Sequence, residues 1–165
     1  MRYDRTQALI AETIVNDWPI EELARIFRVY GEESQAGRLA GVIVKARAEK
    51  RITRTTELSQ IIESVVKRHG KIHPATKVFQ ALRIAVNDEL GELERGLPDL
   101  VDLLAPGGRI AVITFHSLED RLVKRFLKSR SDLKVLTKGV VRPSQEEVRK
   151  NRRARSAKLR VAQRI

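Results

Sequence analysis

Residues 106–121, Pro-Gly-Gly-Arg-Ile-Ala-Val-Ile-Thr-Phe-His-Ser-Leu-Glu-Asp-Arg, decide the fold class of this chain. The turn Pro106-Gly-Gly108 leads into the run 109–115, whose apolar and β-branched residues are typical of a strand buried on both faces of a parallel sheet. The residues from Ser117 onward favour a capped helix. A turn, a buried strand and a helix in this order predict an α/β fold.

Working outward from this stretch, the second half of the chain alternates helices and strands. Strands are predicted at 133–137 and 159–162, and Ser144-Gln-Glu-Glu147 is a candidate capping box between them. Before the central strand, Pro74 opens a long helix that Pro98 is expected to kink or restart. One clear central strand makes a poor complete sheet, so we expect an incomplete sheet whose neighbouring strands lie outside this sequence.

The first 66 residues show a different pattern, with one apolar stripe and one polar face in each of four segments. These predicted amphipathic helices span 6–16, 19–30, 34–48 and 55–66. The pattern is that of a small helical bundle. Residues 69–74 break the periodicity and are interpreted as a linker; His69 and His73 within them cannot share a helix face, so no metal site is predicted there.

Composition excludes several classes of protein. The chain has 165 residues, 42% of them hydrophobic and 33% charged, which is enough apolar material for a core. No window of 18 apolar residues predicts a membrane span, and the first residues do not have the pattern of a signal peptide. Without cysteine, disulfides, thiolate zinc sites and cysteine nucleophiles are excluded. We therefore expect a cytoplasmic, helix-rich, basic protein.

The net charge of +12 is concentrated at one end of the chain. Residues 1–120 contain 17 basic and 18 acidic side chains, whereas residues 121–165 contain 16 basic and 3 acidic ones. Such a basic surface favours a polyanion partner over a solvated tail or an anionic membrane, because neutralising phosphates releases counterions. In the densest cluster, phosphate contact is the preferred interpretation for Arg153, Arg155, Lys158 and Arg160, the last two on one strand face.

Candidate chemistry follows the central strand, because ligands of open α/β sheets bind beyond the carboxyl ends of the strands. The residues at this position are Phe115, His116, Ser117, Glu119 and Asp120. They combine an imidazole, a hydroxyl and two carboxylates that can orient a substrate or move a proton. The alternative is that Ser117 and Asp120 cap the helix while His116 makes a single bond in a turn. The glycine pair at 107–108 precedes the strand, so it does not predict a nucleotide loop.

Several blocks of this sequence together resemble one family, the ribosomal small-subunit RNA methyltransferases called RsmH or MraW. The matching blocks are His73-Pro-Ala, Phe79-Gln-Ala-Leu-Arg-Ile-Ala-Val-Asn-Asp-Glu-Leu90, Pro106-Gly-Gly-Arg-Ile-Ala-Val-Ile, Phe115-His-Ser-Leu-Glu-Asp-Arg121 and Arg155-Ser-Ala-Lys-Leu-Arg160. Weaker matches are Glu21-Glu-Leu-Ala-Arg-Ile-Phe, Tyr30-Gly-Glu-Glu33 and Thr55-Thr-Glu-Leu58. The resemblance runs from Met1 to the C-terminus.

The resemblance implies an S-adenosylmethionine-dependent enzyme that methylates N4 of a cytidine in 16S rRNA, at the decoding centre of the small ribosomal subunit. It implies an all-α insertion domain for substrate recognition at 1–72 and the C-terminal part of a Rossmann-like methyltransferase domain at 73–165. His116, Ser117, Glu119 and Asp120 would then line the active site, supported by Arg83, Asn87 and Phe115. The phosphate contacts would come from Arg153, Arg155, Lys158 and Arg160.

The sequence also departs from the family pattern. The family's first half, with its glycine-rich Gly-Gly-His loop and ribose-binding acidic residue, has no counterpart here, so no cofactor-binding residue is predicted in this chain. Arg152 stands where the family usually has proline. We expect a missing N-terminal half or a homodimer partner to complete the sheet. The alternative function is a non-catalytic RNA-binding or ribosome-associated remnant, or one subunit of a split enzyme.

Overall fold

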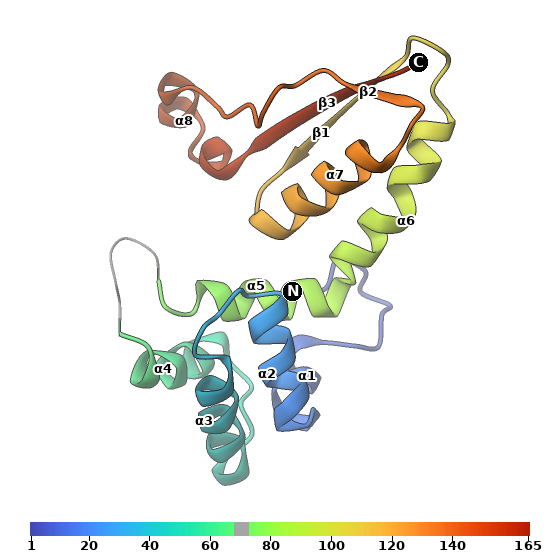
Figure 1. The fold of residues 1–165 in the computed structure, drawn as a ribbon. Coiled ribbons are helices and arrows are strands. Elements are labelled where there is room, and N and C mark those ends of the chain that lie inside the picture. The colour runs from blue at the N-terminus through green and yellow to red at the C-terminus, as the bar shows by residue number, and fades with distance from the viewer. Residues whose placement is uncertain (68–72) are drawn as a thin grey trace. The chain divides into compact units, whose positions relative to one another are not determined.

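The computed structural model describes residues 1–67 and 73–165, which form two compact units (Figure 1). The first unit spans residues 1–89 and the second spans 90–165. Each unit has its own hydrophobic core, so each is described by itself. None of the helices in the described part of the chain is long and apolar enough to cross a bilayer.

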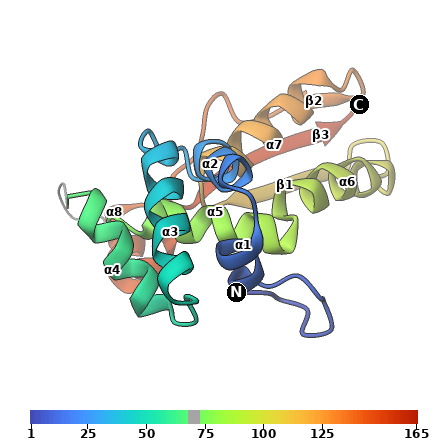
Figure 2. The same cartoon turned by 90° about the horizontal axis from the view of Figure 1, so that it is seen from below.

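The first unit is a bundle of short helices, which confirms the helical pattern of the N-terminal sequence except at 6–10, because the first helix begins only at Ala11. Its helices are α1 (Ala11–Asp17), α2 (Ile20–Val29), α3 (Ala36–Glu49), α4 (Thr55–Val65) and α5 (Thr76–Asn87). In this bundle α3 packs against α2 and α4, and α5 packs against α1 and α2 (Figure 2). Phe27, Leu39, Ile62 and Leu82 are fully buried where these apolar stripes meet, and their burial is the main stabilising contribution.

The second unit places helices against a small antiparallel sheet. Its elements are α6 (Glu89–Asp102), β1 (Arg109–Thr114), α7 (Ser117–Ser129), β2 (Leu133–Val135), α8 (Gln145–Lys150), the 3₁₀ turn η1 (Arg152–Ser156) and β3 (Lys158–Arg164). The strand order is β1-β3-β2, and both pairings are antiparallel. Helix α7 packs against the sheet (Figure 1), and Val123, Leu127 and Ala162 are buried between them. The Ser144 hydroxyl accepts from the amide of Glu147 at 3.1 Å and caps α8, which is the serine half of the predicted capping box.

The prediction that β1 lies in a parallel sheet, buried on both faces, is wrong for the described residues. β1 pairs with β3 alone among them, in antiparallel register, with Val112 opposite Arg160. Its side chains alternate, so Ile110 and Thr114 are buried while Ile113 is 59% exposed. The physical reason is that α7 covers one face of the sheet. The order β1-β3-β2 makes β1 an edge strand of this three-stranded sheet.

The long helix predicted after Pro74 breaks at Asp88 rather than at Pro98. Asp88 adopts a left-handed conformation, with φ of 48°, and separates α5 from α6. Pro98 lies inside α6, where the buried Leu97 and Val101 hold the helix against the core of the second unit. Most of the linker predicted at 69–74 lies outside the described residues. The compact units divide after residue 89 because α5 packs with the bundle, and the domain division at residue 72 stays a prediction.

The helix cap at the end of β1 and the charges around it

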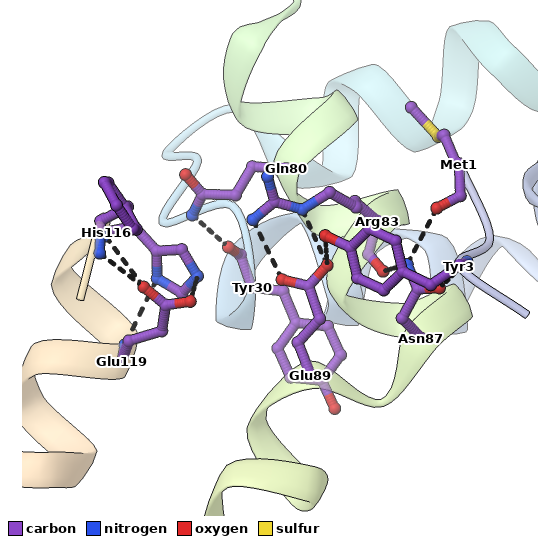
Figure 3. A network of polar contacts seen from close by, with 10 residues as sticks. Met1, Tyr3, Tyr30, Gln80, Arg83, Asn87, Glu89, His116 and Glu119 are labelled. Atoms are coloured by element: carbon purple, nitrogen blue, oxygen red, sulfur yellow. Dashed lines mark hydrogen bonds and ion pairs between the residues drawn. The ribbon is translucent and has the colours of Figure 1, made fainter. Parts of the chain in front are cut away.

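The chain leaves β1 through a reciprocal cap that fixes the start of α7. The amides of Phe115 and His116 both donate to Oε2 of Glu119, at 2.8 and 3.2 Å. The amide of Glu119 donates back to Nδ1 of His116 at 3.3 Å (Figure 3). This arrangement is a capping box in which histidine takes the place usually held by serine or threonine. The alternative interpretation of this segment as a helix cap is therefore correct, but the capping residue is His116 and not Ser117. Ser117 is the first residue of the helix.

The cap also fixes which nitrogen of the neutral His116 ring carries the proton. Because Nδ1 accepts a hydrogen bond, the proton of the neutral ring lies on Nε2. Nε2 lies 3.3 Å from Oε1 of Glu119, and the His116 side chain is only 9% exposed. Imidazole and carboxylate are thus held together in one rigid turn. A fixed ring beside a carboxylate is suited to orienting a substrate polar group or to accepting a proton.

Asp120 does not cap the helix but joins α7 to β3. Its two carboxylate oxygens accept from Nε and Nη2 of Arg160, at 2.7 and 3.0 Å, and Nζ of Lys158 lies 4.0 Å away. The hydrogen bond from Arg160, helped by the positive charges of Arg160, Lys158 and Lys124, lowers the pKa of Asp120 below its usual range. Asp120 therefore stays ionised at neutral pH and is a weak base.

The four predicted phosphate-binding residues fall into two groups. Lys158 and Arg160 face Asp120 from one side of β3, as their spacing predicted, but their side chains are only 19% and 12% exposed. Arg153 and Arg155 lie on the turn η1 and are exposed to solvent. The first pair therefore stabilises the second unit internally, whereas the second pair is available to a partner.

The predicted supporting residues of α5 make contacts within the first unit. Arg83 pairs with both carboxylate oxygens of Glu89, at 2.7 and 3.0 Å. Asn87 accepts from the amide of Tyr3 and donates to the carbonyl oxygen of Met1, so it fastens the N-terminal segment to α5 (Figure 3). The roles of Glu89 and Tyr3 were missed from the sequence, because their partners depend on the turn at residue 88. Whether Arg83 and Asn87 support the active site stays a prediction.

Comparison with known proteins assigns the chain to a family. All 165 residues match the MraW methylase family. The chain belongs to this family. It is 54% identical over 168 residues to the "Ribosomal RNA small subunit methyltransferase H" of Elusimicrobium minutum, and 52% identical over 171 residues to the protein of that name from Persephonella marina. A third such relative, from Thermomicrobium roseum, is 49% identical over 184 residues. The resemblance inferred from the sequence blocks is confirmed.

The coverage of these alignments is unequal on the two sides. Each of the three alignments includes the whole of this chain, but only 57%, 58% and 56% of the respective relative. The chain thus spans a little over half the length of the curated MraW relatives it matches.

Proposed function

We propose that this chain is part of an S-adenosylmethionine-dependent methyltransferase that modifies N4 of a cytidine in 16S rRNA. The observation that carries the proposal is the match of all 165 residues to the MraW methylase family, together with relatives at about half identity that are named as small-subunit rRNA methyltransferases. The substrate would be the small ribosomal subunit or its rRNA, which implies a cytoplasmic location.

The glycine pair at 107–108 does not fit the methyl donor. Its turn precedes β1, whereas a ligand-cradling glycine loop follows a strand. The turn also uses its amides internally, because Gly107 donates to the carbonyl oxygen of Arg164 and Gly108 donates to that of Ala105, both at 2.8 Å. We therefore assign no residue of the described part of this chain to binding of the methyl donor.

What this chain would contribute is the positioning of the target amine and the removal of its proton. The amine loses one proton as its nitrogen gains the methyl group. Oε2 of Glu119 is occupied by two backbone amides, so Oε1, beside the ring of His116, is the acceptor that this segment offers. Asp120 is a positioning residue, because its ion pair with Arg160 holds the first turn of α7 to β3. The base must be unstacked or single-stranded to reach such a segment.

The second candidate is a non-catalytic RNA-binding module, and the charge distribution favours it. Residues 121–165 carry 16 basic side chains against 3 acidic ones, and Arg153 and Arg155 are exposed. Such a surface binds RNA phosphates whether or not the chain takes part in methyl transfer. The two candidates differ in one measurable respect, which is the transfer of methyl groups to the RNA.

A chimera separates them. In the Elusimicrobium minutum relative, the region aligned to residues 1–165 is replaced by this chain, and transfer of tritiated methyl groups to purified small subunits is measured. We expect transfer, and we expect Glu119→Gln in the chimera to slow it by about 10²-fold, the lower range for loss of a general base. The matched control, Glu21→Gln at an exposed position of α2, should leave the rate unchanged. A folded chimera that binds subunits but transfers nothing would favour the second candidate.

A further inference from the structure

A basic hollow in the second unit shares only Arg160 with the basic cluster that the sequence singled out. It encloses about 320 Å³ and is lined by residues of α7, of β3 and of the loop that follows β2. The polar and charged side chains in its wall are Lys124, Lys128, Thr137, Lys138 and Arg160. We propose that this hollow binds a phosphate group of the RNA backbone. The inference rests on the proposed RNA substrate and specifies where the second unit grips it.

Only some cations of residues 121–165 remain available to a ligand. Several of them are already bound within the fold, since Arg130 pairs with Asp102 and Asp132, and Arg164 donates to three backbone carbonyl oxygens. Arg160 gives two hydrogen bonds to Asp120. These cations stabilise the unit and cannot turn to a ligand without leaving a carboxylate or carbonyl unsatisfied. The net charge of residues 121–165 is therefore larger than the number of cations that these residues can offer to RNA.

The three lysines of the hollow are not bound within the fold in this way. Lys124, Lys128 and Lys138 are exposed, and none of them forms an ion pair with a carboxylate in residues 1–67 or 73–165. The charge of Lys124 helps to lower the pKa of Asp120, but that carboxylate is already paired with Arg160. Three ammonium groups around one concavity repel one another, and an anion placed between them removes that repulsion.

The wall of the hollow also supplies a neutral hydrogen-bond donor. The hydroxyl oxygen of Thr137 accepts from the amide of Val161 at 3.3 Å, which leaves its O–H to donate. A phosphodiester has acceptors only, so ammonium groups and a hydroxyl match its chemistry. Lys124 and Lys128 are four residues apart and share one face of α7.

The position of the hollow relates it to the cap at the end of β1. Lys124 follows Asp120 by one turn of the same helix, a rise of about 6 Å. A phosphate held by Lys124 and Lys128 therefore lies within a few nucleotides of a base presented to His116 and Glu119. Phosphate contacts of this kind fix register without reading sequence.

The test measures RNA binding by the full chain. A fluorescein-labelled, single-stranded RNA with the decoding-centre sequence is titrated by anisotropy over a series of salt concentrations. The variant Lys124→Gln/Lys128→Gln/Lys138→Gln is compared with a matched control that removes the same charge elsewhere in the unit. The control is Lys134→Gln/Arg142→Gln/Arg149→Gln, three exposed cations outside the hollow.

We expect the hollow variant to bind RNA roughly 10- to 100-fold more weakly at ~0.1 M salt. The slope of log K against log salt should fall by about 2, since each of the three lost phosphate contacts contributes ~0.7. The control should change both quantities much less. Equal losses in both variants would overturn the inference and leave the proposed function standing, because binding would then be diffuse. No RNA binding by the unmodified chain would overturn the inference and count against the RNA substrate as well.

Amine-reactive footprinting should show RNA protecting Lys124, Lys128 and Lys138, and equal modification with and without RNA would contradict the proposal.

Discussion

Replacing Asp120 by asparagine should destabilise the second unit by removing the charge that two cations share. The Asp120 side chain is 16% exposed and accepts two hydrogen bonds from Arg160, whose own side chain is largely buried. Breaking one partner of a fully buried pair costs about 3–5 kcal/mol, because the other charge is left uncompensated. Partial exposure here, and the one hydrogen bond that an asparagine oxygen can still accept, reduce this to about 2 kcal/mol.

The assay is urea unfolding followed by two signals. Trp18, the single tryptophan, packs against the core of the first unit, so its fluorescence reports that unit. Far-ultraviolet circular dichroism reports both units. Asp120→Asn should shift the dichroism transition that belongs to the second unit and leave the Trp18 transition in place. A double-mutant cycle with Arg160→Gln should give a coupling energy of about 1–3 kcal/mol.

The pH dependence gives an independent check on the same pair. The folded-state pKa of Asp120 is lower than the unfolded value of about 3.9. The stabilising contribution of Asp120 is therefore fully present above the unfolded pKa and is lost as pH falls through the folded-state pKa. The difference in unfolding free energy between the unmodified chain and Asp120→Asn should therefore be constant near neutrality and shrink below pH ~4. A coupling energy near zero, or a difference that does not vary with pH, would refute the reasoning.

Substitutions at four further positions test the local structure. Gly31→Ala should lower the stability of the first unit by more than about 1 kcal/mol, because the added Cβ would lie 2.6 and 2.8 Å from carbonyl oxygens of α2 and α5. Gly37→Ala is the contrasting change, because the space around Gly37 in α3 is open. It should stabilise the unit by up to ~1 kcal/mol in the same urea assay. Glu119→Ala should cost about 1 kcal/mol through loss of the cap, seen as a lower dichroism midpoint, and Glu119→Gln should recover part of it. Asn87→Ala should speed hydrogen exchange at the amide of Tyr3, whereas Asn87→Asp keeps the acceptor and the protection; equal exchange in the two would contradict the contact.

Local pattern predicted the elements of this chain better than their pairing. The helices of the first unit follow from apolar stripes with a helical period, which neighbouring residues alone determine. The partner of β1 is β3, which begins more than forty residues later, and no local period encodes that antiparallel register. The break at Asp88 was missed for a related reason. Left-handed conformations usually fall on glycine, so Pro98 looked like the stronger signal, yet the buried Leu97 and Val101 on either side keep α6 intact.

The residues at the end of β1 show why capping and chemistry need not exclude one another. Sequence reasoning set a local cap against a convergent site, and the cap is what the structure shows: His116 and Glu119 satisfy the first amides of α7. The same bonds fix the ring tautomer and hold Oε1 of Glu119 beside Nε2, so the side chains lose their rotational freedom on folding rather than on binding substrate. A segment that is rigid before its substrate arrives loses less entropy in the reactive complex. The cap therefore supports a positioning role for these residues, and the rate of the Glu119→Gln chimera, set against the stability of the same variant, separates that role from a structural one.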